Sequence, residues 1–365
     1  MEVYLGMDVH CKKSVYVAQD DSGKVIQQGV VPTTLEGFAK MLAAVPALPR
    51  TGLETGTQAM WVAAALSSLG ARPVIIDARE VRIKARRAKQ KSDFRDAFEI
   101  CDGLRRGMYT SIVYVPDPAI QRLRRVLSRR RHFLRIRTSQ VNASKYLLRS
   151  VGLSEEADSL TTEGAWRKLI DRPPVADLRA HLSLHRDLWR VAHAGLLACD
   201  AELSQAVQPF RDIAQLLQTA PGVGPLTSAG FIAVLATPER FPDSSHVASY
   251  IGLVPSTYDS GDAVRHGHIT KRGASHLRML LSEAAQHAAD TRHPLNPYFS
   301  RIAARQGYKK AVVAVAHRLA RILFEMWRKK QPFDPRELNV VPEKHVRART
   351  LYWRIRKPEE ELVRS

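Results

Sequence analysis

Cysteine is scarce in this sequence. Its three cysteines, Cys11, Cys101 and Cys199, stand far apart and form no CxxC pair, so neither a zinc site nor a disulfide framework is expected. No apolar run approaches the ~18 residues that a membrane span needs, and no signal peptide opens the chain. These absences predict a reduced, cytoplasmic protein with no membrane partner.

Acidic residues are few beside the basic ones. The 365 residues include 56 Lys and Arg against 36 Asp and Glu, which gives a formal net charge of +20. Such an excess indicates partners rather than a fold, and without a membrane segment it favours nucleic acid. The apolar fraction of 45% is that of a globular protein. We divide the chain into four parts: 1–115, 116–208, 209–335 and a basic tail, 336–365.

Residues 1–115 predict an α/β domain. The expected order is three strands, helix, strand, helix, strand, helix, beginning with "VYLGMDV" and with "RTGLET" as the fourth strand. Three antiparallel strands followed by alternating helices and strands fit a ribonuclease-H-like (RuvC-like) mixed sheet of five strands. In that topology the first strand is central and the fourth lies beside it.

Four carboxylates are expected to meet in this domain. Asp8 is near the end of the first strand and Glu54 ends the fourth, while Asp93 and Asp96 share one face of a helix. Clustered carboxylates raise one another's pKa, and Mg²⁺ (or Mn²⁺) relieves the repulsion through hard oxygen ligands. Such ions can activate a nucleophile in phosphoryl transfer. The alternative is four separate surface acids, with Asp93 favoured by the helix dipole.

Residues 116–208 predict mostly helix. One long helix is expected from Pro118 to about Gly152, and a later helix could fold back on it as an antiparallel pair that binds nucleic acid, joins subunits, or does both. Apolar residues recur every seven positions, as in a coiled coil, at Ile120, Leu127, Leu134, Val141 and Leu148. Arginines crowd the other faces and, with few acids to pair with, predict phosphate contacts rather than a solvated face. The candidates are Arg124, Arg125, Arg129, Arg130 and Arg131.

Residues 209–335 predict a helical domain that begins with a helix-hairpin-helix. Gly222 and Gly224 in "APGVGP" permit close approach of a nucleic-acid backbone, and the following helix would aim its amides at a phosphate. An ordinary helical hairpin is an equal alternative.

The stretch "STYDSGDAVRHGHITKRG", 256–273, is expected to be a small polar loop that faces an anion. Arg265, His268, Lys271 and Arg272 could contact phosphate. Ser260 precedes a glycine, so its hydroxyl could be exposed on a tight turn as a nucleophile. A serine before glycine is usually only a turn residue, however, and Tyr258 is a rival nucleophile. No Asp-His-Ser triad is evident, which argues against an acyl hydrolase.

Both ends of the sequence resemble one family. "GMDVH", "LETGTQ" and "KSDFRDA" are similar to the three motifs of the DEDD, RuvC-like domain of insertion-sequence-110-type transposases and Piv DNA invertases, over about the first 110 residues. "PGVGPLTSAG" and "YIGLVPSTYDSGDAVRHGHITKRGASHLR" resemble the C-terminal domain of the same family, over about 212–330.

The resemblance implies a transposase that cuts and rejoins DNA strands. Asp8, Glu54, Asp93 and Asp96 would then hold Mg²⁺ (or Mn²⁺), and Ser260 would form a covalent phosphoserine link to DNA. The implied partners are donor and target DNA, a non-coding bridge RNA and further copies of the chain, as a dimer or tetramer in which the acids of one subunit could act with the serine of another. The implied location is a prokaryotic cytoplasm, at the nucleoid when DNA is bound.

Three alternatives stay open. A Piv-like site-specific invertase would use the same residues on a different DNA arrangement. A Holliday-junction nuclease would use water and the acids alone. A structural nucleic-acid-binding protein would use none of these residues for chemistry.

Overall fold

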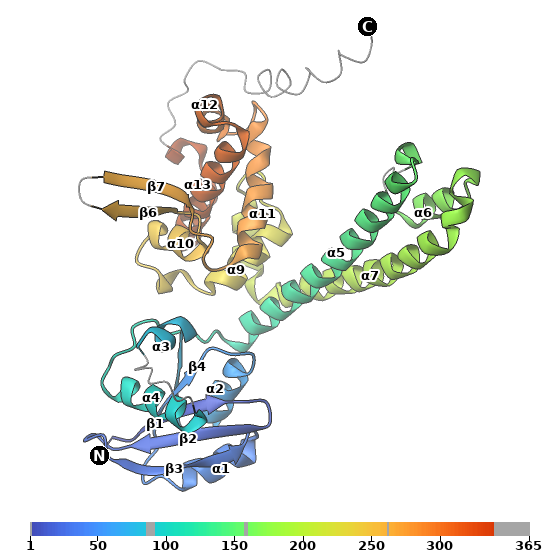
Figure 1. Cartoon of the computed structure of the whole chain (residues 1–365). Coiled ribbons are helices and arrows are strands. Elements are labelled where there is room, and N and C mark those ends of the chain that lie inside the picture. Colours follow the sequence, from blue (N-terminus) through green and yellow to red (C-terminus); the bar gives the residue numbers. More distant parts are fainter. Residues whose placement is uncertain (1, 85–91, 157–159, 261–262, 339–365) are drawn as a thin grey trace. The chain divides into compact units, whose positions relative to one another are not determined.

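The chain forms two compact units, Met1–Pro116 and Asp117–Ser365 (Figure 1). The computed structural model describes residues 2–84, 92–156, 160–260 and 263–338, with backbone alone at 156, 257–260, 263–266, 337 and 338. The predicted tail lies outside the described residues from 339 onward. The division of 117–338 into a middle and a C-terminal domain stays a prediction.

The first unit contains a five-stranded mixed sheet, which confirms that part of the predicted fold. Its strand order is β3-β2-β1-β4-β5, and the central β1 runs antiparallel to β2 and parallel to β4. This order is consistent with a ribonuclease-H-like domain. The strands are β1 (Tyr4–Val9), β2 (Lys13–Gln19), β3 (Val25–Pro32), β4 (Arg50–Glu54) and β5 (Arg72–Ile76).

Helices cover both faces of this sheet. Leu5 and Met7 of β1 pack into a core with Phe38 of α1 (Leu35–Ala43) and Val62 of α2 (Ala59–Ser68). α4 (Asp93–Arg105) packs on the other face, and α3 (Ala78–Lys84) follows β5. Alternation along β1 divides the two faces, because successive side chains of a strand point to opposite sides.

Two glycines let α4 approach the sheet closely. Gly6 of β1 pairs with Gly52 of β4, and a Cβ on Gly6 would overlap the carbonyl of Ala97 and the backbone nitrogen of Cys101. A Cβ on Gly52 would lie 3.0 Å from the side chain of Ile100. The helix backbone therefore rests directly on β1, and side chains of the helix pack on β4.

The second unit begins with an antiparallel helical pair (Figure 1). α5 (Pro118–Ser150) lies against α7 (Arg179–Ala206), with the shorter α6 (Glu163–Ile170) between them in sequence. Side-chain hydrogen bonds between Arg130 and Asp200, and between Gln140 and His185, fix the antiparallel register. Of the seven-residue repeat, Ile120, Leu127 and Leu148 are buried, whereas the two positions between them are half-buried. The coiled-coil description stays a prediction.

The rest of the second unit is a helical body around one core. α13 (Tyr308–Lys329) contributes Val315, Leu319 and Leu323 to that core. The surrounding helices are α8 (Arg211–Gln218), α9 (Pro225–Leu235), α10 (Ser244–Ile251), α11 (Ser275–Gln286) and α12 (Asn296–Gln306). Among the described residues, no helix is both long enough and apolar enough to cross a bilayer.

The stretch expected to be a polar loop is instead largely a β-hairpin. β6 (Pro255–Ser260) pairs antiparallel with β7 (Ala263–Ile269), and Tyr258 faces Arg265 in the register. Thr, Tyr, Val and Ile in these strands favour extended backbone, although the surrounding Asp, Gly and His residues gave the segment the composition of a loop.

Candidate metal and nucleic-acid sites

Asp8 and Glu54 come to one edge of the sheet through the pairing of β1 with β4. The register places Met7 opposite Leu53, so the two acids follow at neighbouring strand ends. They share the face that carries Gly6 and Gly52, since alternate residues lie on one face. Asp8 is half-buried and Glu54 is exposed.

Asp93 and Asp96 lie in the first turn of α4. Ser92 caps this helix by accepting a hydrogen bond from the Arg95 amide at 3.3 Å, and the positive end of the helix dipole stabilises nearby carboxylates. Ala97 packs on Gly6. Asp93 lies one helical turn before Ala97, on the side of Asp8. The close contact of α4 with Gly6 thus brings Asp93 of the helix near Asp8 of the strand.

A histidine and a lysine that the sequence interpretation missed also contact this cluster. His10 Nε2 lies 3.2 Å from Asp8 Oδ2 and 3.5 Å from Asp93 Oδ2, and Lys13 Nζ lies 3.6 Å from the same Asp93 oxygen. The available signal was the position of His10 in "GMDVH", two residues after Asp8.

The group formed by Asp8, His10 and Asp93 could hold a divalent cation. One ligand atom from each lies within 4.8 Å of the other two. Within the described part of the chain, Glu54 and Asp96 do not belong to this group, although both lie on the elements that end beside it. Two carboxylates suit Mg²⁺, and an imidazole nitrogen beside them also suits Mn²⁺. The partial exposure of these side chains leaves space for water or phosphate oxygens.

The base of the hairpin that carries Ser260 is tightly fixed. Gly252 and Gly273 both have positive φ, and a Cβ on either would overlap the main chain of the other segment. Arg278 Nη1 donates to the carbonyls of Ile251 and Arg272, each at 2.7 Å. Burial lowers the pKa of Arg278. This arginine thus joins the segments before and after the hairpin.

Ser260 occupies the last position of β6, where its backbone pairs with Ala263. The turn residues 261 and 262 lie outside the described residues, and so does the side chain of Arg265. His268, Lys271 and Arg272 are exposed near the base of the hairpin. The acids and Ser260 belong to different compact units.

The two glycines of the predicted helix-hairpin-helix differ in their surroundings. Gly222 has a φ of +81°, and a Cβ there would lie 2.7 Å from the carbonyl oxygen of Ala284. Gly224 is the residue before α9 and has open space around it. Gly222 is therefore required by the local packing, and a role of either glycine toward nucleic acid stays a prediction.

The arginines of α5 have several partners inside the protein. Arg124 Nε donates to the Ala233 carbonyl at 2.6 Å, at the C-terminal end of α9. Arg131 Nη1 donates to Ser275 Oγ at 3.2 Å, and Arg125 is exposed.

Two of these arginines form ion pairs with α7. Arg129 pairs with Glu202, and Arg130 Nε lies 2.5 Å from Asp200 Oδ1. The premise that few acids are available is therefore wrong for these two positions. Phosphate binding by the α5 arginines stays a prediction.

Comparison with known proteins gives a consistent result at both ends of the chain. A family model described as the transposase IS116/IS110/IS902 family matches residues 214–300. A second model, for the DEDD transposases of the IS110 type and described as a transposase, matches residues 5–152.

Individual relatives carry related descriptions. The chain is 27% identical to a probable family 20 transposase of Pseudomonas aeruginosa, over 67% of this chain and 74% of that protein. It is 25% identical to the transposase for insertion sequence element IS1111A of Coxiella burnetii, over 67% of this chain and 68% of that protein. A pilin gene-inverting protein of Moraxella lacunata is 29% identical, over 42% of this chain and 45% of that protein.

The two family models match separate parts of the chain, and the first of these parts contains the mixed sheet with Asp8 and Asp93 at its edge. The protein therefore belongs to the family of IS110-type transposases.

Proposed function

We propose that this protein is the recombinase of an insertion sequence and that it cuts and rejoins DNA strands. The observation that carries the proposal is the approach of Asp8 and Asp93 at the edge of the mixed sheet, beside His10. Carboxylates gathered in this way suit a cation that binds phosphate, and the strongly basic chain suits a polyanionic substrate.

Asp8, Glu54, Asp93 and Asp96 are the proposed ligands of Mg²⁺, or of Mn²⁺. When bound, the cation would supply Lewis-acid stabilisation of a reacting phosphate. His10 contacts both Asp8 and Asp93, so it either adds a ligand or orients the two carboxylates. Lys13 keeps a positive charge near Asp93.

Ser260 is the proposed nucleophile. Its Oγ would form a bond to phosphorus while one bond between phosphorus and a sugar oxygen breaks, and the hydroxyl proton would balance the charge on the departing oxygen. The phosphoserine link conserves the bond energy, so rejoining needs no ATP. Arg265, His268, Lys271 and Arg272 would stabilise the negative charge of the phosphate.

The proposed partners are donor DNA, target DNA and a bridge RNA. Recombination joins two duplexes, so a dimer or tetramer is expected, in which the acids of one copy can act with Ser260 of another. The exposed arginines of α5 and the loop before α9, with Gly222 and Gly224, are the proposed contacts with the nucleic-acid backbone.

Substitution of Ser260 tests the covalent step. Ser260→Ala should abolish the protein–DNA adduct that survives denaturation, whereas Tyr258→Phe should retain it. The adduct is measured by electrophoresis of labelled DNA after treatment with detergent. Adducts that persist in Ser260→Ala and disappear in Tyr258→Phe would identify Tyr258 as the nucleophile.

A site-specific invertase is the second candidate, supported by the similarity to pilin gene-inverting proteins. It would use the same residues on two inverted sites within one DNA molecule. Plasmid substrates with inverted sites distinguish inversion from insertion by restriction mapping. Cleaved DNA that never carries protein would instead indicate a water-dependent nuclease.

A further inference from the structure

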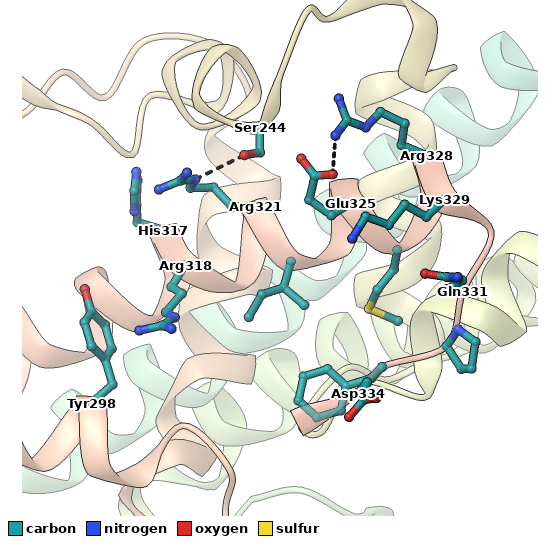
Figure 2. Close-up of a pocket in the computed structure, with 14 residues that line it drawn as sticks. Ser244, Tyr298, His317, Arg318, Arg321, Glu325, Arg328, Lys329, Gln331 and Asp334 are labelled. Atoms are coloured by element: carbon teal, nitrogen blue, oxygen red, sulfur yellow. Dashed lines mark hydrogen bonds and ion pairs between the residues drawn. The ribbon is translucent and has the colours of Figure 1, made fainter. Parts of the chain in front are cut away.

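α13 lines a basic pocket that includes none of the residues discussed above for chemistry or phosphate binding. The pocket has a volume of about 580 Å³ and is bounded by α12, by the first residue of α10 and by residues 331–334 (Figure 2). Its volume lies within the range of small-molecule and cofactor sites. We call it the α13 pocket.

One end of the α13 pocket gathers cationic side chains, and neighbouring groups hold them in place. The guanidinium carbon of Arg318 lies 4.8 Å from the ring centroid of Tyr298, and that of Arg301 lies 5.5 Å from the same ring. Arg321 Nε donates to Ser244 Oγ at 3.2 Å. Figure 2 shows the tip of Arg321 directed toward His317. An arginine fixed in this way loses less conformational entropy when it binds an anion.

The arginine side chains at this end of the pocket repel one another. Burial lowers the pKa of His317, and the nearby Arg321 lowers it further. Burial likewise lowers the pKa of Arg318. Tyr298 opposes this shift, whereas Arg301 and Arg321 add to it. Among the residues that the structure describes, His317 and Arg321 form no ion pair with a carboxylate, and Glu325 pairs with Arg328 at 2.6 Å. An anion bound at this end would relieve the repulsion.

The distribution of charge along the pocket favours a strand over a single small anion. Arg328 and Lys329 line the opposite end, together with Asp334 and with Glu325, which pairs with Arg328 (Figure 2). At a rise of about 1.5 Å per residue, the helix carries Arg318 and Arg328 roughly 15 Å apart. A single phosphate ion cannot contact both ends, whereas successive phosphates of a nucleic-acid strand can. Arginine forks match phosphate oxygens in geometry.

We propose that the α13 pocket binds the phosphodiester backbone of a nucleic-acid strand, with Arg318 and Arg321 as its principal phosphate contacts. The choice of a polyanionic ligand rests on the proposed function. The pocket itself is a separate site from the acids and from Ser260. It would hold a strand during recombination without taking part in the bond exchange.

Strand binding by the full chain tests this proposal. Fluorescence anisotropy with a labelled single-stranded DNA, and with an RNA of the same sequence, gives Kd as a function of salt. Arg318→Gln combined with Arg321→Gln should weaken binding roughly tenfold. The slope of log K against log salt should become shallower by about 1.4, or about 0.7 for each lost phosphate contact on a single strand. The better-bound strand identifies the source of the phosphates.

Arg292→Gln is the matched control. Arg292 is an exposed arginine of the same unit, outside the pocket and paired with Asp290, so its loss should change Kd by less than about twofold. Arg321→Lys retains the charge without the planar fork and should give an intermediate Kd. Thermal unfolding identifies variants that remain folded, and Arg321→Lys provides the test if the double substitution unfolds the protein.

A double variant that binds both strands with the Kd and salt slope of Arg292→Gln would overturn the proposal. Binding of inorganic phosphate to the wild type but not to the double variant, with the Kd for both strands unchanged, would also overturn it and indicate a small-anion site. The test is independent of the covalent step. Ser260→Ala should retain strand binding, and persistence of its adducts would contradict the proposed nucleophile without affecting the pocket.

Discussion

The two compact units contain like-charge clusters of opposite sign. In the first unit a strand and a helix bring Asp8 and Asp93 together, with His10 between them. In the second unit α13 gathers His317, Arg318 and Arg321 along one pocket. The approach of like charges costs electrostatic free energy, which Lys13 offsets in part in the first cluster and a bound counter-ion would offset further in both. The proposed counter-ions are a cation for the first cluster and phosphates for the second.

The arginines of α5 show the opposite arrangement. Arg130 pairs with Asp200, and Arg124 donates to a helix carbonyl, so their charges are used inside the protein. A run of basic residues in the sequence therefore does not by itself identify a binding surface. What distinguishes α13 is that its cations gather in a pocket and repel one another there.

The largest expected effect comes from removing one charge of the acidic cluster. Asp8→Asn preserves the size of the side chain but weakens cation binding, so strand transfer should fall roughly 10³-fold, in line with several kcal/mol of lost transition-state stabilisation. Activity is measured by strand transfer at a series of Mg²⁺ and Mn²⁺ concentrations, with nucleic-acid binding measured in parallel.

Asp21→Asn is the control for this change, because Asp21 is an exposed acid of the same unit outside the cluster. It should leave activity within about twofold. Full activity of Asp8→Asn, or activity of the wild type in excess EDTA, would contradict the cation-binding role of the first cluster.

A smaller effect is expected when the contact between α4 and β1 is disturbed. A Cβ on Gly6 would overlap the main chain at Ala97 and Cys101, so Gly6→Ala should lower the free energy of unfolding by about 3 kcal/mol. Gly56→Ala is the matched control, because a Cβ there meets nothing within 4 Å. Denaturant unfolding followed by circular dichroism measures both. Equal free energies of unfolding for Gly6→Ala and Gly56→Ala would show that α4 does not need a glycine at position 6.

The smallest effect is expected on α5, where two arginines separate structural from binding roles. Arg130→Gln breaks the pair with Asp200 and should lower the free energy of unfolding by about 1 kcal/mol, with little change in nucleic-acid affinity. Arg125 is exposed, so Arg125→Gln should leave stability within about 0.5 kcal/mol. If it contacts phosphate, the salt slope should fall by about 0.7 to 0.9. A loss of affinity in Arg130→Gln with a loss of stability in Arg125→Gln would contradict this assignment of a structural role to Arg130 and a binding role to Arg125.

Much of the first unit could be predicted from the sequence because its signals are local. Alternating strands, capped helices and their order were sufficient to predict the five-stranded mixed sheet with β1 at its centre. The hairpin of β6 and β7 could not be predicted in the same way, since its polar residues resemble those of a loop and pairing across the turn decides its conformation.

The candidate sites likewise include residues that local sequence could predict and residues that only tertiary packing brings together. The sequence predicted that Asp8 and Asp93 lie together, as the structure has them. Lys13 belongs to no motif and reaches Asp93 only because β2 pairs with β1. The α13 pocket gave no sequence signal, since Ser244, Tyr298 and Arg321 come from three helices that are distant in sequence.

The sequence by itself determined the net positive charge, the order of the strands and the positions of the acids. It did so because composition and short-range periodicity depend on neighbouring residues alone. The tertiary structure decided which charges meet. The pairing of Gly6 with Gly52 lets α4 rest on the sheet and carries Asp93 to Asp8, and α7 supplies Asp200 to Arg130. Long-range packing therefore decides which basic residues meet the acids of a neighbouring helix and which gather in the α13 pocket.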